Sequence, residues 1–155
     1  MHDHALRPAT VLPPPLIYAL ALGSAWWLDR RWPLAFDVGS TSHAIAWALI
    51  VLGLLGFAWA LSATRSKRTT VNPYKAASSL ITSGPFRYSR NPIYVSDWLV
   101  YVGIMLFMQT TWPLLLAPLV WGLMRYAVIA HEEAHLQAKF GADYIAYAAS
   151  VRRWI

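Results

Sequence analysis

The sequence has no cysteine and few charged residues. Without cysteine the chain has no disulfide, no thiolate nucleophile and no Cys-ligated metal site. Charged side chains make up 13% of the 155 residues, about half of the roughly 25% that is usual in soluble domains. Hydrophobic residues make up 57%, and the mean hydropathy is +0.40. This composition excludes an intrinsically disordered chain and argues against an ordinary soluble globule, while the length fits one domain.

Aromatic residues, in contrast, are abundant. The chain has nine Trp and eight Tyr, and amphipathic aromatic side chains collect where a bilayer meets water. A net charge of +6 would suit a nucleic-acid partner in a soluble protein. In a chain this apolar we attribute the charge to the positive-inside rule, and we expect no nucleic acid as a partner. The composition therefore predicts an integral membrane protein.

Four uncharged apolar runs predict membrane-spanning helices. A helix needs about 20 apolar residues to cross the bilayer, and residues 44–63 meet this requirement most clearly. The first run lacks a basic start and a small-residue cleavage site, so we interpret it as a retained helix and not as a signal peptide. The predicted spans are about 12–28, 44–63, 93–108 and 112–130. The predicted fold class is all-α: a single membrane-embedded domain, built as a bundle of about four transmembrane helices with a C-terminal cytoplasmic amphipathic helix.

Basic residues lie almost entirely on one side of these predicted spans. Arg30 and Arg31 fall on the other side. The remaining eleven of the 13 are Arg7, Arg65, Lys67, Arg68, Lys75, Arg87, Arg90, Arg125, Lys139, Arg152 and Arg153. Because cytoplasmic loops are enriched in Lys and Arg, the sequence predicts a multi-pass protein of the bacterial inner membrane whose two termini are cytoplasmic.

A first polar segment precedes the third span. Residues 84–94 read Gly-Pro-Phe-Arg-Tyr-Ser-Arg-Asn-Pro-Ile-Tyr. Gly-Pro predicts a turn, and Pro92 suits the first turn of a helix with Asn91 as its N-cap. A helix N-terminus flanked by Arg87 and Arg90 attracts a carboxylate or a phosphate. Basic residues that only face lipid headgroups would give the same pattern, so composition leaves both interpretations open.

A second polar segment, His131-Glu132-Glu133-Ala134-His135, follows the fourth span. Ionisable groups at membrane depth are functional candidates, whereas a span that ends earlier would leave these carboxylates solvated. The stretch also fits the zinc-protease pattern His-Glu-x-x-His. No His or Glu follows it, however, and only Asp143 could serve as a third ligand. We therefore predict no metal site.

The tail predicts an amphipathic helix that lies in the membrane interface. Within residues 132–147, Leu136, Phe140 and Tyr144 recur at helical spacing, and Gly141 interrupts the pattern. Residues 69–83, between the second and third spans, predict an irregular and partly immersed connection.

The two polar segments resemble a known family of membrane enzymes. Residues 80–94 are similar to the Leu-Val-x-x-Gly-x-(Tyr/Phe)-x-x-x-Arg-(His/Asn)-Pro-x-Tyr signature of the isoprenylcysteine carboxyl methyltransferase group, and related phospholipid methyltransferases carry the same Asn-Pro-x-Tyr piece. The resemblance continues in Glu132-Glu133-x-x-Leu136, in Phe-Gly-x-x-Tyr-x-x-Tyr at 140–147, and in Val151-x-Arg153-Trp154. Both segments occur in family order and spacing and cover about half of the chain.

This resemblance implies an integral membrane methyltransferase that uses S-adenosylmethionine. The cofactor would lie at the cytoplasmic ends of the last helices, between residues of about 78–94 and 131–154. Carried over residue by residue, the implied contacts are Ser78, Ser79, Leu80, Ile81, Phe86, Asn91, Pro92, Ile93, Tyr94 and Glu132, together with the adjacent Glu133.

The chemistry of the cofactor agrees with these residue types. Glu132 can accept hydrogen bonds from its ammonium group or its ribose. Arg90, or the N–H groups at the helix start at Asn91, can meet its carboxylate. Phe86 and Tyr94 can cover the adenine or face the sulfonium through a cation–π contact. Methyl transfer is an in-line displacement that needs alignment more than acid–base groups, so the chain needs no catalytic triad.

Two departures from the family pattern leave the acceptor open. The motif His is Asn91 here, and the Arg that binds the substrate carboxylate in the prenylcysteine enzymes falls on Val128. Arg125 lies three residues earlier on the same predicted face and seven residues, about two turns, before Glu132. We predict that Arg125 orients the acceptor, although it could instead snorkel to lipid phosphates. The expected partner is a lipophilic small molecule or a lipid that offers a carboxylate or an amine.

Two other functional classes compete with this interpretation. A sterol-reductase-like membrane oxidoreductase has a related helical frame and would use NADPH. A non-catalytic membrane scaffold or a small transporter would need no cofactor, but a transporter is expected to carry charges in mid-span. Asp97 and Arg125 both lie near predicted span ends. The sequence specifies no oligomeric state.

Overall fold

The computed structural model describes residues 13–36, 39, 41–66 and 79–155. The predicted contact Ser78 and most of the predicted connection 69–83 lie outside these residues. The described elements are α1 Pro14–Arg31, α2 Ser42–Ser66, the 3-10 helix η2 Gly84–Arg87, α3 Pro92–Met108, α4 Trp112–Gly122, the π-helical segment η3 Leu123–Ile129, α5 Ala130–Phe140 and α6 Ala142–Ser150. Apart from one isolated β-bridge between Ala35 and Thr110, the regular structure of this part of the chain is helical. The all-α fold class is confirmed.

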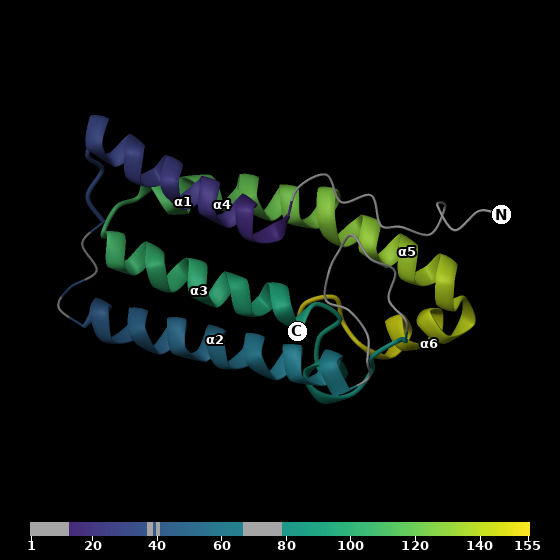
Figure 1. The fold of residues 1–155 in the computed structure, drawn as a ribbon. Coiled ribbons are helices and arrows are strands. Elements are labelled where there is room, and N and C mark those ends of the chain that lie inside the picture. Colours follow the sequence, from purple (N-terminus) through teal and green to yellow (C-terminus); the bar gives the residue numbers. More distant parts are fainter. Residues whose placement is uncertain (1–12, 37–38, 40, 67–78) are drawn as a thin grey trace.

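The long helices form an up-and-down bundle (Figure 1). α3 lies between α1 and α2, and α1 also packs against α4 and η3. One end of the bundle holds the starts of α1 and α3, the end of α2, and α5 with α6. The C-terminus returns to the same end. Two polar segments that are distant in the sequence therefore meet there.

α2 and α3 approach closely because glycines remove side chains from their interface. A Cβ atom on Gly103 would lie 2.6 Å from Ile50 Cγ1 and 2.9 Å from the Ala46 carbonyl oxygen. A Cβ atom on Gly53 would lie 2.7 Å from the Ser96 carbonyl oxygen. Small residues that let two backbones approach are typical of helix packing in membranes.

Two of the described helices, Ser42–Ser66 and Trp112–Phe140, are long and apolar enough to cross a membrane. They contain the second and the fourth predicted spans. α3 begins one residue before the third predicted span and ends with it, but it is a shorter apolar helix. α1 contains most of the first predicted span and ends in Asp29, Arg30 and Arg31.

The sequence predicted that the helix of the fourth span ends at about Ala130. In the structure this helix continues through η3 and α5 to Phe140. Neither Pro nor Gly occurs between Gly122 and Gly141, so the chain contains no helix breaker there. The predicted break at Gly141 is confirmed, since its φ of +51° separates α5 from α6. The predicted amphipathic tail is therefore the end of a long helix followed by the short α6, which buries Tyr144 and Tyr147.

The hydrophobic core lies between α1, α3 and the long helix. Its largest members are aromatic: Tyr18 from α1 and Tyr94 and Tyr101 from α3. η3 adds Met124, Val128 and Ile129, each with no exposed surface, and Trp154 of the tail packs against the same core. Three of these core residues carry a phenol, so polar atoms are buried inside an apolar bundle.

Candidate functional site

The chain enters α3 through a compact turn. Gly84 has a φ of +63°, which glycine adopts without strain, and η2 follows with Pro85 buried. Pro92 opens α3 as predicted, and Asn91 occupies the N-cap position. The prediction that the Asn91 side chain caps the helix is wrong. Its Nδ2 donates instead to the carbonyl oxygen of Arg153, at 2.9 Å, because the tail brings that carbonyl within reach.

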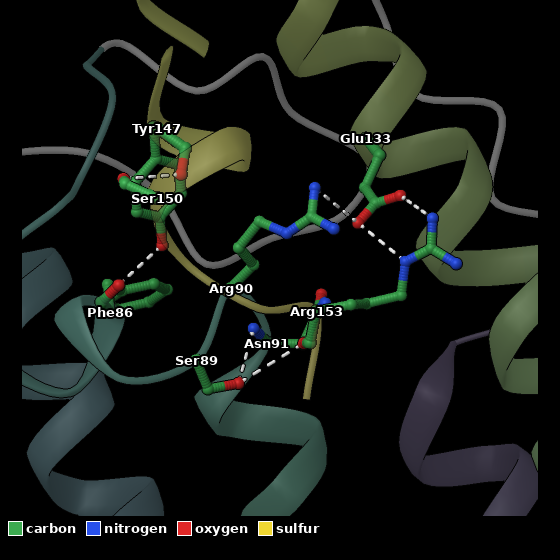
Figure 2. A network of polar contacts seen from close by, with 8 residues as sticks. All are labelled: Phe86, Ser89, Arg90, Asn91, Glu133, Tyr147, Ser150 and Arg153. Atoms are coloured by element: carbon green, nitrogen blue, oxygen red, sulfur yellow. Dashed lines mark hydrogen bonds and ion pairs between the residues drawn. The ribbon is translucent and has the colours of Figure 1, made fainter. Parts of the chain in front are cut away.

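The end of the chain binds this turn through its backbone (Figure 2). The N–H of Arg90 donates to the Arg152 carbonyl oxygen at 2.9 Å. Ser89 Oγ donates to the Arg153 carbonyl oxygen at 3.4 Å and accepts from the N–H of Asn91 at 3.1 Å. These bonds fix the start of α3 and the C-terminal tail relative to each other.

A tyrosine of α6 adds a second attachment. Tyr147 Oη donates to the Phe86 carbonyl oxygen at 2.7 Å (Figure 2). Burial raises the pKa of Tyr147 to about 12. The phenol is therefore protonated at physiological pH and available as a donor.

Glu133 is held by two arginines. Arg153 binds it with two parallel bonds, Nη2 to Oε2 at 2.6 Å and Nε to Oε1 at 3.0 Å, and Arg90 Nη1 lies 3.4 Å from Oε1. The hydrogen bonds to Glu133 raise the pKa of Arg153 above its ordinary value. These three groups leave one net positive charge. Glu133 and Arg90, both predicted to contact a cofactor, thus have partners within the protein.

The neighbouring Glu132 faces α3. Tyr94, 7% exposed, donates its Oη to Glu132 Oε1 at 2.7 Å. Successive residues of a helix point about 100° apart, so the two adjacent carboxylates bind different partners. Glu132 accepts no other hydrogen bond from a described residue. Its second oxygen is therefore available to a ligand.

The other predicted contact residues lie in the chain before α3 and in its first turn. Residues 79–81 stand where the described chain resumes, and Ile81 is buried. Phe86 is partly buried, Pro92 is buried, and Ile93 packs against the hydrophobic core. Among the described residues of the predicted set, the structure joins Tyr94 to Glu132 by a hydrogen bond and Arg90 to Glu133 by an ion pair.

Arg125 lies within η3, and neither a hydrogen bond nor an ion pair joins it to Glu132. Its guanidinium stands 5.1 Å from the ring centre of Trp121 and 5.6 Å from that of Tyr126, a ring that is 64% exposed. The prediction of a shared face with Glu132 assumed α-helical periodicity. A π-helix bonds residue i to i+5 and turns less per residue, so seven residues no longer make two turns. Val128, the other position considered, is buried in the core.

Two polar residues close to Tyr94 had no part in the predicted site. Asp97 lies one helical turn along α3, and Tyr18 reaches the core from α1. A charged residue inside an apolar run was a signal for Asp97. No sequence signal identified Tyr18, because the contact between α1 and α3 depends on the fold.

These polar atoms suit a zwitterionic ligand. Glu132 Oε2 can accept from a cationic group, while Arg90 Nε is a buried donor without a partner among the described residues. The net positive charge of Arg90, Arg153 and Glu133 attracts a carboxylate. Within the ranges that the structure describes, no three His, Asp or Glu side chains are grouped to hold a metal ion.

A family model described as phospholipid methyltransferase matches residues 41–143. This range includes α2, α3, the long helix and the Tyr94–Glu132 bond. No curated protein and no solved structure matches the chain.

Proposed function

Because the chain belongs to the phospholipid methyltransferase family, we propose that it transfers a methyl group from S-adenosylmethionine to a lipophilic acceptor in the membrane. Family membership by itself makes the chain a methyltransferase that acts on membrane lipids. Our proposal goes beyond family membership in two respects: it names S-adenosylmethionine as the cofactor, and it names a carboxylate or an amine as the acceptor group.

The Tyr94–Glu132 bond is the observation that carries this proposal. It joins the start of α3 to α5 across 38 residues, and its distance is 2.7 Å. The tail closes over the same end through Arg152 and Arg153. The two segments that carry the methyltransferase motifs therefore converge on one carboxylate with an open acceptor position.

Each remaining polar group has a role toward the zwitterion. When bound, S-adenosylmethionine supplies an electrophilic methyl group on its sulfonium. Glu132 accepts hydrogen bonds from the ammonium group or the ribose, and Arg90 Nε, with the N–H groups at the start of α3, meets the carboxylate. The rings of Phe86 and Tyr94 cover the adenine or the sulfonium. Ser78 to Ile81 complete the contacts, and Glu133 positions Arg90.

The proposal includes a membrane arrangement. α1 and α3 join the two long apolar helices as further spans, which requires local thinning of the bilayer because both are short. Eleven of 13 basic residues then lie on one side, so the site and both termini face the cytoplasm, in the inner membrane of a bacterium.

Arg125 is proposed to orient the acceptor from the lipid-facing side. The motivation is its position on the long helix with the exposed rings of Trp121 and Tyr126. Arg125→Ala should then raise the KM for the acceptor while leaving cofactor affinity nearly unchanged. If neither value changes, Arg125 only snorkels to lipid phosphates.

Calorimetric titration of the purified protein in detergent tests the cofactor. We expect S-adenosylmethionine to bind and NADPH not to bind, and transfer of a labelled methyl group to a lipid should follow. The matched variants are Glu132→Ala, which should lose affinity, and Asp143→Ala at an exposed acid of α6, which should not. Binding of NADPH alone would favour the sterol-reductase class, and binding of neither would favour a scaffold.

A further inference from the structure

Asp97 is a charged residue on the inward face of α3. It lies three residues after Tyr94 and four before Tyr101, and residues at these spacings share one helical face. Both tyrosines belong to the core between α1, α3 and the long helix. Asp97 itself is partly buried and accepts no hydrogen bond from any described residue. A carboxylate without a partner in such a setting is costly, and it marks a functional site more often than a structural one.

α1 contributes a second unpartnered group next to Asp97. Tyr18 is 7% exposed, and its ring centre lies 5.8 Å from that of Trp98 and 6.0 Å from that of Tyr101. Among the described residues, Tyr18 Oη and Trp98 Nε1 are fully buried and have no hydrogen-bond partner. No hydrogen bond joins the Tyr18 hydroxyl to Asp97 or to any other described residue. Both groups therefore leave hydrogen-bonding capacity unused within the described protein, and a ligand with matching donors would satisfy it.

The donor and acceptor types select the ligand. Asp97 accepts hydrogen bonds and carries the only formal charge of this cluster, Tyr18 accepts or donates, and Trp98 donates. An anionic group would be repelled by Asp97. A primary amine has several N–H donors and, when protonated, a positive charge that the carboxylate and the aromatic rings both favour.

We propose that Asp97, Tyr18 and Trp98 bind the amine end of the acceptor lipid, one helical turn beyond the Tyr94–Glu132 bond. This site rests on the proposed function, since the acceptor of a lipid methyltransferase must place its reacting atom near the cofactor. Three residues of α-helix rise about 4.5 Å. The amine would thus be held close to the carboxylate that is proposed to bind the cofactor.

Binding at this site can be measured without catalysis. The indole N–H signals of ¹⁵N-Trp-labelled protein in maltoside micelles would be recorded during titration with lysophosphatidylethanolamine, lysophosphatidylcholine or lysophosphatidylglycerol. Trp98→Phe assigns the Trp98 signal. We expect a saturable shift with the ethanolamine lipid, a weaker effect with the choline lipid, which has no N–H, and none with the glycerol lipid.

Variants connect the shift to the carboxylate. Asp97→Asn should weaken binding of the ethanolamine lipid by about tenfold or more, the loss expected for a hydrogen bond to a charged group. Tyr18→Phe removes only a hydroxyl and should weaken binding of the ethanolamine lipid several-fold. If Asp97→Asn does not fold, Tyr18→Phe tests the proposed site in its place. Asp143→Asn, at an exposed acid, should bind like the wild type. Equal shifts with all three lipids, or unchanged affinity in both site variants, would overturn the proposal and leave ordered water as the partner of these groups.

A methylation assay separates this site from the proposed function. Should the wild type methylate no lipid while the ethanolamine lipid still shifts Trp98 in an Asp97-dependent way, the site stands and the function fails. If Asp97→Asn methylates an amine lipid with unchanged KM, the site fails and the function stands. The affinity of Asp97→Asn for S-adenosylmethionine should equal that of the wild type in calorimetry.

Discussion

Tyr94 and Glu132 lie 38 residues apart in the sequence and are joined by a hydrogen bond of 2.7 Å between Tyr94 Oη and Glu132 Oε1. The phenol occupies one oxygen of the carboxylate and thereby orients the other. A side chain that is already fixed loses little conformational freedom when a ligand binds. The bond therefore prepares Glu132 for a second partner.

Removal of the carboxylate should weaken cofactor binding. Glu132→Ala should cost about 1.5–3 kcal/mol of S-adenosylmethionine affinity, the range for a hydrogen bond to a charged group. Tyr94→Phe should cost less, and the double variant should cost less than the sum because the two side chains form one unit. Calorimetry on the four proteins gives the coupling. Unchanged affinity in a folded Glu132→Ala protein would sink the assignment.

Glu133 should behave as a structural residue. Glu133→Gln leaves Arg90 and Arg153 side by side without a counter-charge, so we expect a loss of about 1–3 kcal/mol in unfolding free energy, between the values for exposed and buried pairs. Faster hydrogen exchange at the Arg90 amide, which is bonded to the tail, should accompany it. Asp143→Asn is the matched control. A loss of cofactor affinity with unchanged exchange would instead make Glu133 a direct ligand.

The attachment of α6 should depend on pH through Tyr147. Its pKa is raised from 10.0 to about 12, so the folded state holds this proton more tightly than the unfolded state. The resulting stability is fully present below about pH 10 and is lost as the pH rises toward 12. Tyr147→Phe should reduce this loss, and at pH 7 it should cost about 0.5–1.5 kcal/mol because the Phe86 carbonyl loses its donor.

Thermal unfolding in detergent at pH 7, 10 and 11 measures both effects. Tyr88→Phe, at a tyrosine that is 61% exposed, controls for the loss of a phenol. An unchanged slope between pH 10 and 11 in Tyr147→Phe would contradict the assignment.

The α2–α3 interface should tolerate no added methyl group. Gly103→Ala would place a Cβ 2.6 Å from Ile50 Cγ1, and overpacking of this kind costs about 1–3 kcal/mol. Gly23→Ala is the control, because nothing lies within 4 Å of its added Cβ and alanine favours the helix by about 0.8–1 kcal/mol. The melting temperature should fall in the first variant only. If Gly103→Ala melts at the same temperature as the wild type, α2 and α3 can move apart at little cost and the prediction of a tight interface is wrong.

Topology can be tested by cysteine labelling, since the chain has no native cysteine. With the site in the cytoplasm, Trp32→Cys should react with an impermeant reagent applied to intact cells, whereas Ser150→Cys should react only after permeabilisation. Trp32 follows the end of α1 and Ser150 ends α6, and the end of α1 and α6 lie at opposite ends of the bundle (Figure 1). The reverse pattern would invert the orientation.

The sequence by itself determined the helices and the end of the bundle at which the polar groups gather. Apolar runs define the helical segments, and Pro92 and Gly141 mark boundaries because the first starts a helix cheaply and the second adopts a positive φ. Because the predicted spans are almost free of charge, the sequence predicted that Arg90, Asn91 and the Glu132–Glu133 pair lie at the same end of the bundle. These are local properties of composition and backbone, and they need no knowledge of contacts.

Only the tertiary structure decided which polar group binds which. The sequence favoured Glu132 as the cofactor ligand and added the adjacent Glu133, but it did not show that Tyr94 binds the first and two arginines bind the second. Asn91 turned from a helix cap into a partner of the tail. The π-helical segment changed the helical register between Arg125 and Glu132, and the packing of α1 against α3 brought Tyr18 against Trp98 and Tyr101. Each of these relations depends on contacts between residues far apart in the chain or on a change of helical register. Local helix propensity and α-helical spacing predict neither the long-range contacts nor the change of register.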